Sequence, residues 1–246
     1  MTLLQLNDVS RRFGGVIAVD SVGFSIDAGE IVGLMGANGA GKTTLFSLIA
    51  GNQRPSAGEI LLDDRRIDGL RPDQISRLGV ARTFQIVRPF AGLTVLENVA
   101  IGALFGNGRE KSIARANSVA RKVLEQVGLA DRAEDSASSL NLSGRKRLEI
   151  ARALATNPRL LMLDEVMAGL TPTEGAEAVA MIRRLHEARD LTLIVVEHVM
   201  GILMDLCPRI VVLHHGALIA EGLPREVAND QRVIDSYLGS RQGPQA

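Results

Sequence analysis

The sequence predicts an α/β fold in which a core of strands and helices carries an N-terminal antiparallel β region and an inserted helical subdomain. Three observations lead to this class. A short apolar run at 31–35 is followed by a glycine-rich loop and then by a helix-like segment at 45–50. Residues 22–26 alternate between apolar and small or polar side chains, as a half-buried strand does. Residues 95–155 have helical patterns throughout, although strand-like segments lie on both sides of them.

We therefore expect a single domain over residues 1–246, in which the helical subdomain interrupts the core. The core is expected at 1–90 and 156–246, and the helical subdomain at 91–155. Hydrophobic residues make up 46% of the chain, which is enough to form a packed core.

Composition argues against several classes of protein. Lys plus Arg and Asp plus Glu number 28 each, so no overall charge draws the chain to nucleic acid or anionic lipid. The single cysteine, Cys207, forms no internal disulfide and fits a reducing compartment. The N-terminus lacks a signal-peptide pattern, and no apolar run approaches the ~20 residues that cross a bilayer. We expect a soluble, cytoplasmic chain that reaches a membrane only by docking onto partner helices.

The N-terminal region is predicted to be β-structure over residues 3–30, with a turn at 27–30. Phe13 stands out here because aromatic residues are only 3% of the chain. An exposed aromatic ahead of the glycine-rich loop could stack on an adenine ring. An ordinary core aromatic is the alternative, although the neighbouring residues 11–12 and 14–15 look like an exposed turn.

The glycine-rich loop organises the rest of the chain. Residues 36–43 match the P-loop pattern G-x-x-x-x-G-K-T, and they lie between a predicted strand and a predicted helix. This context aims several backbone N–H groups at one anion. Lys42 is expected to reach the β- and γ-phosphates of a nucleoside triphosphate, and the Thr43 hydroxyl to hold Mg²⁺. The residues expected to bind nucleotide in this segment are Gly36, Asn38, Gly39, Gly41, Lys42, Thr43 and Thr44.

The middle of the chain alternates briefly and then becomes helical. Strands are predicted at 59–62 and 80–85 and a short helix at 73–78, and Gln85 opens a segment with breakers at Pro89 and Gly92. The helices are predicted at 95–104, 109–127 and 144–154. Thr94 and Glu97 have the spacing of a capping box, and Gly128 is a typical helix stop.

A second apolar strand, 160–163, is followed by two carboxylates. Asp164 at a strand end can hold Mg²⁺ through its water shell. Glu165 can then take a proton from an attacking water. A further helix is predicted at 173–188 and a strand at 192–196. His198 follows that strand, and we expect it to sense phosphate rather than to be an ordinary surface or core histidine.

The C-terminal region is predicted to form a hairpin and two short helices. His214 and His215 look like a metal pair, but a turn between strands at 210–213 and 217–220 explains them better. The helices are predicted at 225–229 and 232–238.

These motifs, in this order, resemble the ATP-binding subunits of ABC transporters over nearly the whole chain. The shared motifs are the P-loop at 36–43, Gln85 as Q-loop, 160–165 as Walker B, 168–171 as D-loop and His198 as switch histidine. Four segments look more narrowly like the ATPases of branched-chain amino-acid importers: Ala81–Gln85, Arg147–Leu154, Val196–His198 and Tyr237–Gly239.

The resemblance implies a P-loop NTPase core of the RecA type, ATP and Mg²⁺ as cofactors, and ATP hydrolysis coupled to transport. Gln85 would join Thr43 and Asp164 around the metal, and Gln85, Glu165 and His198 would serve hydrolysis. The implied partners are a second ATPase subunit bound head to tail, transmembrane permease subunits and, indirectly, an extracytoplasmic solute-binding protein. The implied location is peripheral, on the cytoplasmic face of the inner membrane.

The signature motif departs from the family's L-S-G-G-Q. Counting back without gaps from Ile150 places the motif at 140–144, so Asn141 stands where the serine belongs and Ser143 and Gly144 follow it. The alternative register uses Leu142-Ser143-Gly144 and shortens the link to Ile150 by two residues. A helix starting at Ser143 or Gly144 would present N–H groups to the γ-phosphate bound on the partner subunit. Val166 also departs from the family, which usually has proline after the glutamate.

Other functions remain as alternatives. An importer ATPase for urea or amides shares the same motifs. Translation or DNA-maintenance ABC ATPases usually carry two nucleotide domains or long coiled coils, for which 246 residues leave no room. A GTPase or small-molecule kinase is disfavoured because the chain has no N-K-x-D motif.

Overall fold

The computed structural model describes residues 1–84 and 89–238. The chain divides into two compact units. Unit 1 comprises residues 1–27, 31–69 and 195–246, and unit 2 comprises residues 28–30 and 70–194.

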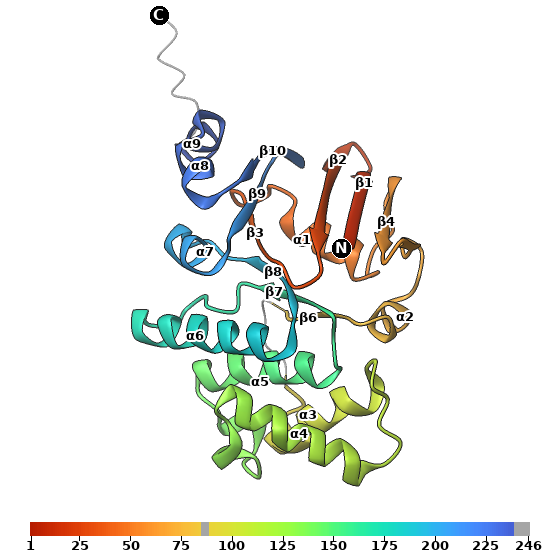
Figure 1. Cartoon of the computed structure of the whole chain (residues 1–246), viewed down its shortest axis with the longest axis vertical. Helices are drawn as coiled ribbons and strands as arrows, with labels where there is room; N and C mark the ends of the chain where they lie inside the picture. The colour runs from red at the N-terminus through yellow and green to blue at the C-terminus, as the bar shows by residue number, and fades with distance from the viewer. Residues whose placement is uncertain (85–88, 239–246) are drawn as a thin grey trace, which may run out of the picture. The chain divides into compact units, whose positions relative to one another are not determined.

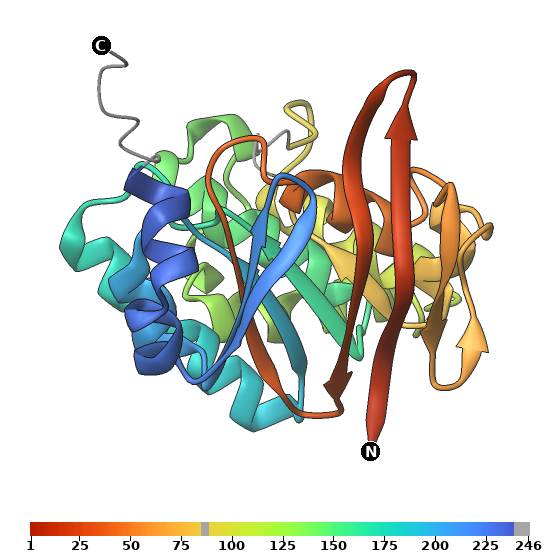
Figure 2. The same cartoon turned by 90° about the horizontal axis from the view of Figure 1, so that it is seen from above.

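Unit 1 contains an antiparallel sheet with the strand order β2-β1-β4-β5. Figure 2 shows β1 and β2 as a long hairpin. Val22, Phe24 and Ile26 of β2 are buried while the residues between them are exposed, which confirms the predicted alternation. The strands are β1 (Thr2–Phe13), β2 (Val16–Asp27), β4 (Ala57–Leu62) and β5 (Arg65–Arg66).

Unit 1 also contains strands β3 (Ile31–Met35), β9 (Arg209–His214) and β10 (Ala217–Gly222). Strand β3 pairs in parallel with β9, and β9 pairs antiparallel with β10, so the predicted hairpin at the two histidines is confirmed. All five residues of β3 are buried. The helices of this unit are α1 (Lys42–Ile49), α7 (Met200–Leu206), α8 (Pro224–Asn229) and α9 (Gln231–Leu238).

Unit 2 has strands β6 (Val80–Arg82) and β7 (Leu160–Asp164), which pair in parallel, and β8 (Thr192–Val196) begins in it. Strand β7 is buried along its whole length, as its continuous apolar run predicts. Helices α2 (Pro72–Arg77) and α6 (Pro172–Arg189) flank these strands in the chain.

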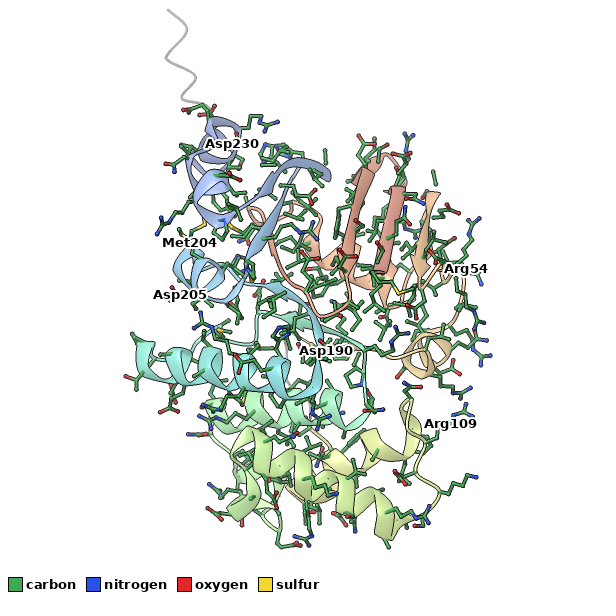
Figure 3. The ribbon with its side chains drawn as sticks, viewed as in Figure 1. Arg54, Arg109, Asp190, Met204, Asp205 and Asp230 are labelled. Carbon is green, nitrogen blue, oxygen red and sulfur yellow. The ribbon has the colours of Figure 1, made fainter. Side chains whose placement is uncertain are left out.

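The rest of unit 2 is helical, which confirms the predicted pattern. Helices α3 (Val95–Phe105), α4 (Ile113–Val127) and α5 (Leu142–Ala155) pack against one another (Figure 1). Short 3₁₀ turns lie at Ala130–Arg132 and Ala137–Ser139. Charged side chains occupy the outside of each unit, for example Arg54 in unit 1 and Arg109 in unit 2 (Figure 3).

The helix ends that the sequence predicts from specific capping residues are confirmed. Thr94 and Glu97 form the predicted capping box on α3, and Gly128 ends α4 in the left-handed conformation at φ 71°. Helix α4 begins at Ile113 rather than at residue 109, because the Ser112 side chain caps it. Strand β6 ends at Arg82 rather than at residue 85.

The sequence predicts no membrane-spanning segment and no internal disulfide at Cys207. No helix in the described part of the chain is long and apolar enough to span a bilayer. Cys207 is buried, and burial raises the pKa of its thiol to about 12, which fits a structural role for this side chain.

Candidate functional site

The P-loop glycines occupy conformations that other residues rarely adopt. Gly36, Gly39 and Gly41 have φ values of 148°, 79° and 104°. A Cβ atom at Gly36 would overlap the carbonyl oxygen of Leu213, and one at Gly41 would overlap the carbonyl oxygen of Ala18. The loop therefore follows a path that only glycine allows at these two positions.

The loop ends at a helix N-terminus that is suited to an anion. Helix α1 begins at Lys42, with Gly41 in the cap position, where no side chain caps the helix. The first N–H groups of a helix have no intrahelical acceptor, and the helix dipole favours negative charge there. Asn38, Gly39 and Thr43 are exposed and Thr44 is half-buried, so this end of the loop faces outward.

Lys42 crosses the loop and holds it closed. Its Nζ donates to the carbonyl oxygens of Gly36 at 2.6 Å and Ala37 at 3.1 Å, and its side chain is buried. The turn of the β9–β10 hairpin adds support, since the N–H of Gly216 donates to the carbonyl of Ala40 at 3.0 Å. The loop is thus fixed from inside and from the neighbouring hairpin.

The C-terminal helix also contacts the loop. The N–H of Gly36 donates to the hydroxyl oxygen of Tyr237 in α9, and the two atoms are 3.0 Å apart. Partial burial raises the pKa of this tyrosine. Sequence reasoning noted Tyr237 only within a family resemblance and did not predict this contact. No local signal links residues so far apart in the chain.

The two carboxylates of unit 2 lie at the end of β7, as predicted. Asp164 is the last residue of the strand and Glu165 follows it, and both are buried. Glu165 adopts a left-handed conformation with φ 51°, which is uncommon for a residue other than glycine. The chain therefore turns sharply at the residue expected to act as the base.

A cation pairs with the first carboxylate. Arg82 Nη2 in β6 lies 2.7 Å from Asp164 Oδ2, and both side chains are almost wholly buried. Thr83 holds the backbone of Asp164, because the N–H of Asp164 donates to the Thr83 hydroxyl at 3.0 Å. Sequence reasoning placed Arg82 and Thr83 in a strand and in a segment that resembles the branched-chain importer ATPases, but assigned them no role.

Helix α5 contacts the backbone of Glu165. The buried Lys146 ammonium donates to the backbone carbonyl of Glu165 at 2.9 Å. One turn further along α5, Glu149 accepts from the N–H of Phe84 at 3.4 Å and pairs with Arg152 at 3.1 Å. Burial raises the pKa of the Glu149 carboxyl, and the positive charges of Arg152 and Lys146 oppose that rise.

Helix α5 begins at Leu142, earlier than the expected start at Ser143 or Gly144. Asn141 is its N-cap residue, and Asn141 Oδ1 accepts from the N–H of Gly144 at 2.8 Å. Asn141 is exposed, Ser143 is half-buried and Gly144 is buried. The expected start is therefore wrong, because an asparagine caps the helix before the serine.

The remaining candidates have simpler surroundings. Phe13 ends β1, is 41% exposed, and has the Arg11 guanidinium 4.5 Å from its ring centroid. His198 follows β8 and is exposed, and Val166 is buried. Gln85 lies outside the described residues.

The candidate residues thus form two groups, one in each unit. The P-loop, Phe13 and His198 belong to unit 1. The two carboxylates and the signature segment belong to unit 2, where Arg82 contacts the Asp164 carboxylate and α5 contacts the Glu165 backbone.

The chain is similar in sequence to ATP-binding proteins of ABC transporters. Two family profiles match: one described as ABC transporter at residues 19–168, and one described as branched-chain amino acid ATP-binding cassette transporter at residues 217–242. The chain is 41% identical to the high-affinity branched-chain amino acid transport ATP-binding protein LivG of Escherichia coli, covering 96% of this chain and 98% of that protein. It is 37% identical to BraF of Pseudomonas aeruginosa, described in the same words, with the same coverage.

Solved structures give the same result. The ADP conformation of MJ1267, an ATP-binding cassette of an ABC transporter, superposes with a TM-score of 0.89 at 29% identity, covering 97% of this chain and 99% of that one. A dimeric post-hydrolysis state of the cassette MJ0796, bound to ADP and phosphate, superposes with a TM-score of 0.80 at 26% identity. It covers 91% of this chain and 99% of that one.

Proposed function

The chain belongs to the ATP-binding subunits of ABC transporters, which bind and hydrolyse ATP, and we propose that it powers the import of branched-chain amino acids. The observation that carries the substrate class is the likeness to LivG over 96% of the chain, together with the branched-chain profile at residues 217–242. The ATPase does not touch the cargo, so this assignment rests on likeness and not on a substrate pocket.

We propose that the P-loop binds the triphosphate. Two arguments support this role: the glycine-only path at Gly36 and Gly41, and the uncapped N-terminus of α1. Lys42 is already directed across the loop, and a bound phosphate would offer its ammonium a charge-assisted bond in place of neutral carbonyls. Gly39, Asn38 and Thr44 complete the cradle in this proposal, and Phe13 supplies an exposed ring for the adenine.

Hydroxyl, carboxylate and amide oxygens, such as Thr43, Asp164 and Gln85 carry, are ligands that suit Mg²⁺. Among residues 1–84 and 89–238, no cluster of three or more His, Cys, Asp or Glu side chains is arranged to hold a metal. Mg²⁺ needs no such cage, because it keeps several waters and binds substrate phosphates with one or two protein ligands. We propose that Thr43, Asp164 and Gln85 hold it, and that it neutralises charge on the phosphates when bound.

Glu165 is proposed as the general base that takes the proton from the attacking water, with Gln85 and His198 assisting near the γ-phosphate. In support, Glu165 directly follows a buried strand and sits in a turn whose backbone conformation is unusual. Such conformations cluster at active sites, where surrounding structure over-determines them.

A second subunit completes the proposed assembly. The dimeric structure of MJ0796 is the structural precedent. Each ATP would lie between the P-loop of one subunit and Asn141, Ser143 and Gly144 of the other, and closing of the pair would drive the permease helices. The chain would act as a peripheral protein on the cytoplasmic face of the inner membrane, bound to permease subunits and served by a solute-binding protein.

The test is transport by the reconstituted complex. The chain, its permease subunits and the solute-binding protein are placed in vesicles, and ATP-dependent uptake of radiolabelled leucine, isoleucine and valine is measured. The matched control is Glu165→Gln, which keeps the shape of the side chain but removes the base and should lower ATP hydrolysis about 10²–10⁴-fold. Uptake of urea or short amides instead of the amino acids would contradict the proposed cargo. A Glu165→Gln complex that hydrolyses ATP at more than about a tenth of the wild-type rate would contradict the proposed base.

A further inference from the structure

Helix α5 contains a buried lysine that bonds to the backbone of Glu165. Lys146 is 6% exposed, and its Nζ lies 2.9 Å from the Glu165 carbonyl oxygen. An ammonium group taken out of water loses hydration and is retained only where other groups replace it. Its contact with Glu165 is therefore a specific interaction that the fold maintains at a cost.

The bonded residue has an unusual backbone conformation. Glu165 has φ 51°, in the left-handed region that is sterically unfavourable for a residue with a Cβ atom. The same carbonyl oxygen accepts a second bond, from the N–H of Ala168 at 3.2 Å. Two donors thus converge on the carbonyl of the strained residue, and one of them comes from helix α5.

A lysine here could merely neutralise a buried acid. Glu149, one turn along the same helix, is buried, and the positive charge of Lys146 lowers the pKa of its carboxyl. However, Glu149 already pairs with Arg152 at 3.1 Å, whereas the ammonium of Lys146 donates its hydrogen bond to the backbone of Glu165. Neutralising Glu149 does not require Lys146 to reach a backbone carbonyl beyond the end of β7.

We propose that Lys146 is a positioning residue for the general base. By holding the Glu165 carbonyl, it fixes the left-handed turn and so the direction in which the glutamate side chain leaves the backbone. A general base must come within ≈ 2.6–3.2 Å of the atom whose proton it takes. This inference rests on the proposed role of Glu165. It also makes α5, whose N-cap is Asn141, the element that couples the signature segment to the base in the same chain.

The first test separates rate from binding. In the reconstituted complex, Lys146→Met removes the donor and keeps a long apolar side chain, and we expect kcat for ATP to fall about 10- to 100-fold, the size of effect that a displacement of about 1 Å produces. KM for ATP, and the affinity of the isolated chain for a fluorescent ATP analogue, should stay within about twofold of wild type, because the hydrogen bond of Lys146 goes to Glu165 and the proposal gives Lys146 no part in binding ATP. Lys146→Arg keeps a cationic donor and should recover most of kcat. Lys122→Met, an exposed lysine on α4, is the matched control and should leave all values unchanged.

The second test asks whether Lys146 acts through the base. Adding Lys146→Met to Glu165→Gln should lower the residual rate no further, since the group that Lys146 positions is already absent. An equal loss in both backgrounds would overturn the proposal and make Lys146 a general structural residue. A wild-type kcat for Lys146→Met, beside an inactive Glu165→Gln, overturns this inference alone. An active Glu165→Gln overturns the proposed base itself.

Thermal unfolding of the Lys146→Met chain shows whether a loss of kcat is due only to misfolding. If Lys146→Met does not fold, Lys146→Gln replaces it, because the amide keeps a neutral donor. Its kcat should lie below those of wild type and Lys146→Arg, but above the value expected when the contact is lost. A folded Gln variant with wild-type kcat in the complex would equally overturn the proposal.

Discussion

The backbone N–H of Gly36, at the start of the P-loop, donates to the hydroxyl of Tyr237, in a bond of 3.0 Å between residues 201 positions apart. Gly36 is buried, so its N–H has little access to water. Helix α9 therefore supplies an acceptor to the nucleotide loop. The profile described as branched-chain amino acid ATP-binding cassette transporter covers this helix, which gives the C-terminal region a physical link to the loop.

Tyr237→Phe should loosen the start of the P-loop. Losing the partner of a buried N–H costs about 1–3 kcal/mol, and the partial exposure of Tyr237 lets water reduce that loss to about 1 kcal/mol of unfolding free energy. Denaturant unfolding measures the stability, and hydrogen exchange should show faster exchange of the Gly36 amide. Ser236→Ala on the same helix, whose hydroxyl bonds to the carbonyl of Val233, is the control and should leave that amide unchanged. Equal Gly36 protection in Tyr237→Phe and wild type would refute the link.

The sequence predicted contacts that are close along the chain better than contacts that are distant. The capping box at Thr94 and Glu97 and the stop at Gly128 need only neighbouring residues, so residue types and spacing were enough. Helix α7 was missed because Met200–Leu206 is short and apolar, with no side chain bonded at its cap. The Tyr237 contact was missed because tertiary packing alone decides it.

Lys42→Ala should abolish ATP binding. The change removes the cation that is directed across the P-loop, and a neutral side chain cannot replace a charge-assisted bond to phosphate. Binding of a fluorescent ATP analogue to the purified chain measures the loss, and circular dichroism confirms that the variant is folded. Near wild-type affinity in a folded Lys42→Ala chain would mean that the P-loop assignment is wrong.

Arg82→Met should destabilise the fold because it leaves Asp164 as a buried charge without its ion pair. Breaking such a pair from one side costs about 3–5 kcal/mol. Adding Asp164→Asn removes the orphaned charge, so the double variant should be more stable than Arg82→Met alone. Denaturant unfolding of the four chains gives the coupling energy.

The control for this cycle is Arg121→Met. Arg121 pairs with Glu134, but those side chains are 56% and 70% exposed, so the loss should stay below about 1 kcal/mol. Additive effects of the Arg82 and Asp164 changes would contradict the pairing.

The same pair shows why part of the candidate site escaped sequence analysis. Asp164 was predicted from its position after an apolar strand, which is a local pattern. Arg82 lies on the neighbouring parallel strand, where Arg82 is in register with Met162. Strand register is set by the packed sheet and not by any local residue pattern, so the partner of Asp164 could not be inferred.

The last prediction concerns the register of the signature motif, and so the role of Asn141. Asn141 Oδ1 caps α5 by accepting from the N–H of Gly144 at 2.8 Å, which leaves the amide nitrogen of this exposed side chain to donate outward. Under the ungapped register, that nitrogen donates to the γ-phosphate bound on the partner subunit. Asn141→Asp keeps the helix cap, since aspartate and asparagine cap about equally well, but it brings a carboxylate to the phosphate. The ATPase rate of the assembled complex should therefore fall about 100-fold or more, as when a transition-state donor is lost.

Two comparisons decide between the registers. The isolated Asn141→Asp chain should unfold like wild type and still bind nucleotide, since Lys42 is untouched, so any loss in the complex comes from the composite site. Ser143→Ala should be mild, because Ser143 then stands at a glycine position of the motif where only the backbone matters. The register that starts at Leu142 predicts the reverse, with Ser143→Ala severe and Asn141→Asp silent. ATPase measurements on both variants in the reconstituted complex distinguish the two, and the cap at Asn141 makes the ungapped result the expected one.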